Sequence, residues 1–318
     1  MEFIFSSDCL LHNTGSHPEC IGRLDKFRDL PNNVVHSGEQ FLKLVHTNDH
    51  IEKVRQSCMQ SLPLDNDTLT SPNSYLAGCA AVGASITAAT SGGFALVRPP
   101  GHHAYPQRSS GFCLFNNIAI AVRFLTNQGK KVFILDIDGH LGDGTSSVFY
   151  DNPQVLYCSL HQYPAFPGTG WVDEIGSGRG QGFTINLPMP PASGDDVFRN
   201  GLDYILPIAR AFGPEIVAVS AGFDGHQLDP LLQLQLSLGC YHQCGAWLRS
   251  NFEEVFAVLE GGYYLNILPK AIYQFVDGIN GKTPEFMEES TSSDPAVHTA
   301  FNRNLDQLHQ ILKDYWPI

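Results

Sequence analysis

The sequence lacks the features that mark membrane-spanning, secreted and disulfide-linked proteins. Its 318 residues contain no apolar run near the ~18 residues that a membrane span needs. The first residues, MEFIFSSDCLLHN, have neither the basic region nor the long apolar core of a signal peptide. The eight cysteines are scattered and form no CxxC pair, which indicates reduced thiols. We therefore expect a cytoplasmic protein that is not associated with a membrane.

Basic residues are also scarce. The chain has 19 Lys and Arg against 32 Asp and Glu, so its formal net charge is -13 at pH 7. This balance argues against direct binding of nucleic acid, because neutralising phosphates requires clustered Lys and Arg. It is compatible with a cationic substrate. A hydrophobic content of 43% and a charged content of 16% are typical of a folded chain with a sizeable core.

No internal repeat, low-complexity tract or flexible linker divides the chain, and apolar runs alternate with helical patterns instead. We expect strands within 93–103, 130–138, 154–162, 182–189, 214–224 and 253–264, and helices within 75–93, 115–129, 195–213, 234–252 and 266–279. Nearly continuous apolar strands between helices predict a parallel sheet that is covered on both faces. We therefore expect one three-layer α/β domain over residues 1–318, with a mainly parallel central sheet and a closing helix or tail at about 285–318.

Carboxylates and histidines gather where these strands end, and the carboxyl ends of parallel strands are where such sheets bind ligands. Asp136, Asp138, His140 and Asp143 follow one apolar run, and side-chain alternation can place the first three on one side. A divalent metal would compensate for the crowded carboxylates. Asp138, His140 and Asp224 form a three-ligand set, which leaves a position for water or substrate. Zinc, iron(II) and other divalent metals all suit these ligands.

Three other motifs resemble functional motifs but lack a feature that the function needs. HTNDH at 46–50 has the spacing of two helical ligands but lacks the glutamate of HExxH, so it indicates the start of a helix. CYHQC at 240–244 lies in an apolar helical stretch, where a helix would point His242 away from both thiols, so small core residues are expected. GHLGDGT lacks the lysine of a phosphate-binding loop.

Taken together, these segments resemble the histone deacetylase family, the zinc-dependent acyl-lysine and acetylpolyamine amidohydrolases of the arginase–deacetylase fold. The resemblance runs from about SHPECIGRL (16–24) to LEGGYYL (259–265). It includes RPPGHHA, SGFCLFNN, LDIDGHLGDGT, SLHQYPAFPGTG and SAGFDGHQLDPL. From this resemblance we expect the family's fold, its zinc cofactor and its acylated substrates.

The resemblance implies a catalytic role for two histidines, each oriented by a carboxylate, and for a tyrosine that donates its hydroxyl to the developing oxyanion. The implied catalytic residues are His102, His103, Asp136, Asp143 and Tyr263. The implied zinc ligands are Asp138, His140 and Asp224. Asp136 would orient His102, and Asp143 would orient His103, which is the preferred general base.

The resemblance also implies residues that bind the substrate and a structural potassium ion. Gly111, Phe112 and Phe166 would line a narrow acyl-lysine tunnel, Asp67 would grip substrate backbone amides at its rim, and Leu231 would lie at the same rim. The expected monovalent-cation site is formed by Asp136, Asp138, His140, Ser159 and Leu160.

One position departs from the family pattern, because Leu141 stands where the family usually has a second histidine. That histidine is not a ligand, so catalysis remains expected, with lower metal affinity or rate. Leu141 is the only support for a weakly active acyl-lysine-binding or polyamine-binding protein.

Two enzymatic alternatives remain. A binuclear ureohydrolase of the same fold needs DxHxD, and this chain has Gly142 where the second aspartate would stand. An acetylpolyamine deacetylase would need an acidic gatekeeper near Asp229 and Pro230, where Leu231 and Leu232 follow instead. Acylated lysine in proteins or peptides is therefore favoured as the substrate over acetylated polyamine.

Overall fold

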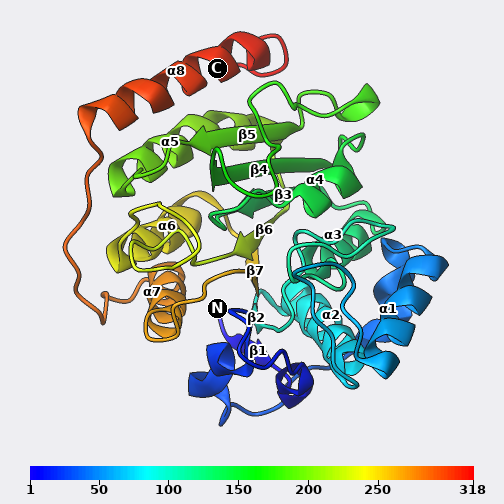
Figure 1. Cartoon of the computed structure of the whole chain (residues 1–318). Coiled ribbons are helices and arrows are strands. Elements are labelled where there is room, and N and C mark those ends of the chain that lie inside the picture. Colours follow the sequence, from blue (N-terminus) through cyan, green and yellow to red (C-terminus); the bar gives the residue numbers. More distant parts are fainter.

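The apolar runs of the sequence form a seven-stranded sheet in the computed structural model, which describes residues 1–318 (Figure 1). The strands are β1 (Phe3–Phe5), β2 (Phe94–Leu96), β3 (Val132–Asp136), β4 (Val155–Gln162), β5 (Thr184–Met189), β6 (Ile216–Ala221) and β7 (Val255–Leu259). Their order is β1-β2-β7-β6-β3-β4-β5, and every neighbouring pair is parallel. The predicted α/β class with a central parallel sheet is therefore confirmed.

Helices cover both faces of this sheet (Figure 1). The α-helices are α1 (Asn48–Gln60), α2 (Ser74–Ser91), α3 (Asn117–Thr126), α4 (Asp143–Phe149), α5 (Asp195–Phe212), α6 (Leu238–Asn251), α7 (Leu268–Asn280) and α8 (Pro295–Leu312). Short 3-10 helices span Ser7–Leu11, Ile21–Phe27, Gly38–Leu44 and Gly178–Gly180. Helices α2, α3 and α4 pack on one face with α1 outside α2, and α5, α6 and α7 lie on the other. The result is a helix–sheet–helix sandwich.

The central strands are buried along their whole length. Every residue of β3, β4 and β6 is buried, because helices cover both faces, and this explains why the sequence shows continuous apolar runs rather than alternation. Two glycines let α6 and α7 approach closely. A Cβ on Gly245 would lie 2.2 Å from the Phe275 carbonyl oxygen, and one on Gly278 would lie 2.1 Å from that of His242.

Two structural interpretations of motifs are confirmed. Thr47 is the N-cap of α1, and its hydroxyl accepts the His50 backbone N–H at 3.2 Å, so HTNDH begins a helix. Cys240 and Cys244 are buried in α6 as free thiols, while the His242 ring donates to the Lys282 carbonyl at 2.9 Å. Neither motif contributes to the group of side chains that could hold a metal ion.

The C-terminal segment forms α8, which lies along the β5 edge of the sheet (Figure 1). The Asn304 side chain donates to the Pro188 carbonyl at 2.9 Å, and the Trp316 indole donates to the Gly182 carbonyl at 2.7 Å. Like the other helices, α8 does not combine the length and apolar character that crossing a membrane requires.

The order of the strands places the candidate ligands at a switch point. From β3 the chain proceeds outward to β4 and β5, and it then returns to add β6 on the other side of β3. Such switch points open a crevice beyond the carboxyl ends of the strands. Asp138 and His140 follow β3 and Asp224 follows β6, so all three lie at this crevice.

A buried ionic cluster joins the N-terminal segment to the loops beneath this crevice. Glu19 accepts from Arg98 at 2.6 and 2.7 Å and from Arg23 at 3.3 Å, and all three residues are fully buried. Arg23 also donates to the carbonyl oxygens of Gly262, at 2.7 Å, and Glu260. One carboxylate therefore balances two arginines, one of which fixes the loop after β7.

We predict that Glu19→Gln lowers the free energy of unfolding by about 3–5 kcal/mol, because it leaves two buried guanidinium groups without a counter-charge. Denaturant titration would measure the loss. Glu39→Gln is the matched control, since Glu39 pairs with Arg55 at 2.7 Å on the surface, where such a pair contributes at most about 1 kcal/mol. Equal losses in the two variants would contradict the prediction.

Candidate active site

Three side chains converge where β3 and β6 end: those of Asp138, His140 and Asp224. One ligand atom from each lies within 4.8 Å of the others. The His140 Nδ1 atom is 2.8 Å from Asp224 Oδ2 and 3.3 Å from Asp138 Oδ1. Both carboxylates are buried, and the imidazole is partly buried. The structure thus brings the three predicted ligands together.

Backbone amides orient the two carboxylates. Asp138 Oδ2 accepts the Gly261 N–H at 2.7 Å, and Asp224 Oδ1 accepts the Gly139 N–H at 2.7 Å. Each carboxylate therefore turns its other oxygen toward His140. A Cβ on Gly261 would lie 2.5 Å from oxygens of both aspartates, so only glycine fits between them.

The charge of this group favours a cation at its centre. Burial and the charge of Asp138 raise the pKa of Asp224. Although burial opposes protonation of His140, Asp224 and Asp138 raise its pKa to about 10. Two carboxylate oxygens and one imidazole nitrogen that face a common point form a donor set for a divalent metal, and they leave further coordination positions open. The residues present therefore fit a catalytic metal ion.

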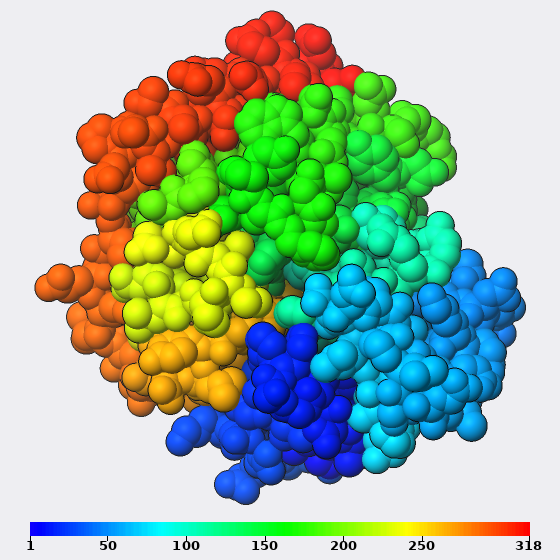
Figure 2. Space-filling model, in the orientation of Figure 1, coloured from blue at the N-terminus to red at the C-terminus, as the bar shows by residue number.

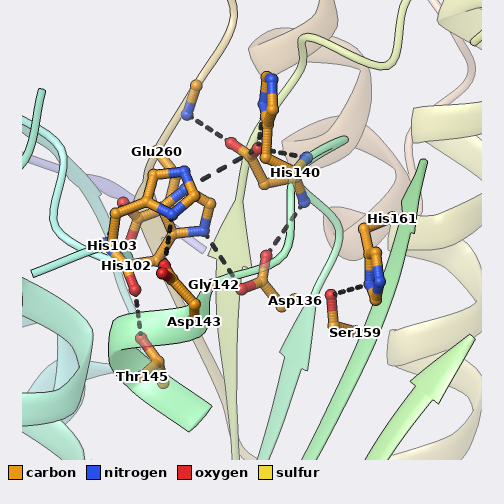
Figure 3. Close-up of polar contacts among 12 residues, drawn as sticks. His102, His103, Asp136, His140, Gly142, Asp143, Thr145, Ser159, His161 and Glu260 are labelled. Atoms are coloured by element: carbon orange, nitrogen blue, oxygen red, sulfur yellow. Dashed lines mark hydrogen bonds and ion pairs between the residues drawn. The ribbon is translucent and has the colours of Figure 1, made fainter. Parts of the chain in front are cut away.

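Two histidine–carboxylate pairs stand beside this group (Figure 3). His103 Nδ1 donates to Asp143 Oδ1 at 2.7 Å, and His102 Nδ1 lies 3.3 Å from Asp136 Oδ2. The two rings are 4.0 Å apart between centroids, which disfavours protonation of both. The structure places the four predicted residues in the predicted pairs.

The two histidines lie in different electrostatic environments. Burial and the neighbouring His102 lower the pKa of His103 to about 4. Burial also lowers the pKa of His102. The carboxylates of Asp138 and Asp136 outweigh this effect and raise the pKa of His102 well above its ordinary value. His103 is therefore neutral. Its Nδ1–H is used by Asp143, so Nε2 is free to accept a proton.

Two tyrosines that the sequence reading did not assign complete these pairs. The Tyr157 hydroxyl donates to Asp136 Oδ2 at 3.0 Å, and the Tyr105 hydroxyl donates to Asp143 Oδ2 at 2.9 Å. Tyr105 directly follows RPPGHHA and Tyr157 lies in the expected strand 154–162, but nothing in the sequence indicates which carboxylate each one reaches.

Glu260 is a further residue that the sequence reading missed. Its Oε2 accepts the backbone N–H groups of Gly101 and His102 at 2.7 and 3.0 Å, which fixes the start of the histidine loop. Glu260 is fully buried and its Oε1 has no partner, and burial raises its pKa to about 7. The available signal was a charged residue directly after the apolar strand β7.

A cavity of about 210 Å³ leads to the convergent side chains. Its lining consists of Asp67, His103, Gly111, Phe112, His140, Phe166, Leu231 and Tyr263. Figure 2 shows one face hollowed near its centre, where segments of several colours from different parts of the chain meet. The structure thus places all five predicted substrate-binding residues around one cavity with His103, His140 and Tyr263.

The wall at Gly111 and Phe112 has an unusual backbone. Both residues have positive φ, at +52° and +69°, a backbone region that residues other than glycine rarely adopt. A Cβ on Gly111 would lie 2.5 Å from the His103 ring, so glycine is required. The Phe112 N–H donates to the buried Thr68 hydroxyl at 3.2 Å, and its ring meets the Tyr263 ring edge-on at 5.6 Å.

Tyr263 is held by a carboxylate from the loop after β6. Asp229 Oδ2 accepts the N–H groups of Tyr263 and Tyr264 at 2.6 and 3.2 Å, and Oδ1 accepts that of Leu231 at 3.1 Å. Asp229 therefore joins the rim to the tyrosine loop. Burial raises the pKa of Tyr263 well above its ordinary value, so its phenol stays protonated and can donate.

Of the residues expected at a monovalent-cation site, Asp136 ends β3, and Ser159 and Leu160 lie on β4. Asp138 and His140 follow β3, and His140 also lines the cavity. Ser159 is the register partner of Asp136, and Leu160 follows it on β4. His161 Nε2 donates to the Gly170 carbonyl at 3.0 Å, so its Nδ1 must accept from the Ser159 hydroxyl at 2.9 Å (Figure 3). The lone pairs of Ser159 therefore remain available to a cation.

Comparison with known proteins agrees with this geometry. Residues 16–279 match the family model of the histone deacetylase domain. Histone deacetylase 10, chloroplastic, of Oryza sativa subsp. japonica is 35% identical over 311 residues, which cover 84% of this chain and 70% of that protein. A probable deacetylase of Methanothermobacter thermautotrophicus is 36% identical over 328 residues, which cover 97% of this chain and 98% of that protein. The crystal structure of the HDA15 HD domain superposes with a TM-score of 0.89 at 31% identity, covering 99% of this chain and 96% of that one, and confirms the arginase–deacetylase fold.

We predict that Asp224→Ala weakens binding of a divalent metal by more than about 100-fold, because losing a direct ligand costs more than the 10–100-fold typical of an outer partner. Elemental analysis after dialysis against a defined free-zinc buffer would measure it. Asp67→Ala removes a carboxylate from the same cavity outside the convergent group, and it should retain the metal. Stoichiometric metal in the Asp224 variant would contradict the assignment.

Proposed function

Because the chain belongs to the histone deacetylase family, we propose that it is a metal-dependent amidohydrolase that removes acetyl or other acyl groups from lysine side chains of proteins or peptides. The family assignment supports deacetylase activity in general. The observation that carries the specific proposal is the convergence of Asp138, His140 and Asp224 beside the cavity that His103 and Tyr263 line.

Asp138, His140 and Asp224 would hold the metal ion, and we propose zinc, with iron(II) as the alternative that the same donors allow. A divalent metal bound there would polarise the amide carbonyl and increase the acidity of the attacking water. The buried carboxylates and the partly buried imidazole keep this chemistry away from bulk solvent. We also propose a structural potassium ion near Asp136 and Ser159, whose free lone pairs support it.

His103 acts as the general base in this proposal. Its Nε2 takes a proton from water as the oxygen attacks the amide carbon, while Asp143 holds the Nδ1–H. The same proton then passes to the lysine nitrogen as the C–N bond breaks, and this leaves a carboxylic acid and a free amine. The lowered pKa of His103 supports this role, because the ring is neutral before the attack.

Tyr263 and His102 complete the proposed chemistry. The carbonyl oxygen gains negative charge as water adds, and the protonated Tyr263 phenol donates a hydrogen bond to it. His102 stays hydrogen-bonded to Asp136, which limits the movement of its ring beside His103. The Gly261 N–H keeps Asp138 oriented throughout the cycle.

The cavity supports an acylated lysine as the substrate. The rings of Phe112 and Phe166 offer apolar walls to a slender methylene chain, and the exposed Asp67 at the mouth can accept backbone N–H groups of a peptide. Leu231, 37% exposed, lines the mouth where a polyamine would need a carboxylate for its distal ammonium. An acetylpolyamine is therefore the less favoured substrate.

The test is hydrolysis of an acetyl-lysine peptide and of N-acetylputrescine by the zinc-loaded protein, with and without a hydroxamate chelator. The expected result is that the protein hydrolyses the peptide and that the chelator abolishes this hydrolysis. Turnover of the polyamine alone would overturn the substrate assignment. Tight binding of the peptide without hydrolysis, with the metal in place, would indicate an acyl-lysine-binding protein instead.

We predict that Tyr263→Phe lowers kcat by about 10²–10³-fold, because a single oxyanion donor contributes about that much in other hydrolases. Metal content and KM should change little, since the ring and its backbone contacts remain. Steady-state kinetics on the acetyl-lysine peptide would measure the loss. Tyr264→Phe, which alters the neighbouring phenol outside the cavity lining, is the matched control. An unchanged rate in the Tyr263 variant would remove its assigned role.

A further inference from the structure

The Asp143 carboxylate has a donor on each of its oxygens. Asp143 Oδ1 accepts from His103 Nδ1 at 2.7 Å, and Oδ2 accepts from the Tyr105 hydroxyl at 2.9 Å. Asp143 is 7% exposed, so water has little access to replace either donor. The orientation of this carboxylate is therefore set by two protein groups, only one of which belongs to the catalytic pair.

Tyr105 is itself held on three sides. Its N–H donates to the Arg108 carbonyl at 2.9 Å, and the Arg108 guanidinium carbon lies 3.8 Å from the centroid of its ring. Its carbonyl accepts from His46 Nδ1 at 3.1 Å, because His46 Nε2 already accepts the Asn116 N–H at 2.8 Å. The hydroxyl that reaches Asp143 thus comes from a side chain with a fixed backbone and a covered ring face.

Tyr105 does not line the cavity, so it has no contact with the substrate. Burial and the charge of Asp143 raise the pKa of Tyr105 well above its ordinary value, so the phenol remains a donor at neutral pH. Without this donor, the carboxylate would be held only through Oδ1 and could rotate about its Cβ–Cγ bond. Such rotation moves the acceptor of His103 and hence the position of its free Nε2.

We propose that Tyr105 is a positioning residue for the hydrolysis: its hydroxyl fixes the Asp143 carboxylate, which in turn fixes the His103 imidazole for proton transfer. This inference rests on the proposed function. The second pair has the same arrangement, since the Tyr157 hydroxyl donates to Asp136. In both pairs, His102–Asp136 and His103–Asp143, the carboxylate thus accepts a hydrogen bond from a tyrosine hydroxyl.

The test compares Tyr105→Phe with the unmodified, zinc-loaded protein on the acetyl-lysine peptide. The variant keeps the ring and its packing against Arg108 and loses one hydrogen bond, so kcat should fall about 3- to 10-fold. KM should stay within about 2-fold, because Tyr105 has no contact with the substrate. Titration with a tightly binding hydroxamate measures the concentration of intact sites. The fall in kcat should remain when the rate is divided by this concentration.

The chain offers a matched control in Tyr75. The Arg55 guanidinium lies 4.3 Å from the centroid of its ring, and its hydroxyl donates to the exposed Glu39 carboxylate at 3.0 Å, outside the site. Tyr75→Phe therefore removes a phenol–carboxylate hydrogen bond, together with the one that the hydroxyl accepts from Arg55 at 2.8 Å, at a distance from the site, and it should leave kcat unchanged.

The outcomes distinguish failure of the positioning role from failure of the proposed function. If the unmodified protein hydrolyses the peptide and Tyr105→Phe has the same kcat per intact site, the positioning role is wrong and the proposed function stands. An equal loss in Tyr75→Phe, or a loss confined to the number of intact sites, would likewise reject positioning in favour of a structural effect. If the unmodified protein hydrolyses no acyl-lysine peptide, the proposed function fails and the inference fails with it.

Discussion

The rest of the site depends on negative charge buried where β3 and β6 end. Asp136, Asp138 and Asp224 are each at most 1% exposed, and ionised carboxylates are stable in such surroundings only with charged or N–H partners. Two imidazoles and several backbone amides supply part of that stabilisation. A cation among the oxygens would supply the remainder. Glycine at position 261 follows from the same need, because a side chain there would displace the Asp138 oxygen that its N–H holds.

Position alone gives the identical side chains of His102 and His103 opposite pKa shifts. His102 lies near two aspartates, which raise its pKa, whereas His103 is paired with Asp143 alone and lies beside His102, so burial keeps it neutral. Pairs of titratable groups whose environments separate their pKa values mark acid–base sites. A bound metal ion adds positive charge near Asp138 and would weaken the effect of that carboxylate on His102. Burial is the largest cause of the lowered pKa of His103.

The sequence was sufficient for the main strands and for the grouping of Asp138, His140 and Asp224, because polar residues at the ends of apolar runs are a local signal. A continuous apolar run indicates a strand buried on both faces, and its carboxyl end indicates where a polar side chain faces a ligand. The positions of Glu260, Asp229, Tyr105 and Tyr157 could not be derived in this way. Each acts on a group far away in sequence, and the pairing depends on how separate loops meet. Strand β1 was missed because its three residues are too few to show a pattern.

Leu141 shows how the site can differ from the family pattern without losing its geometry. The residue is 3% exposed, and its Cδ2 lies beside Gly170 and the His161 ring, within the main apolar core. A leucine there adds apolar burial and gives the metal-binding group no polar neighbour. The orientation of the ligands then rests on the backbone, since the amides of Gly139 and Gly261 hold the two carboxylates whatever side chain stands at 141. A backbone donor, unlike a side-chain donor, has no rotamer freedom of its own to lose when it orients a carboxylate. The convergent group can therefore persist although the second histidine is absent.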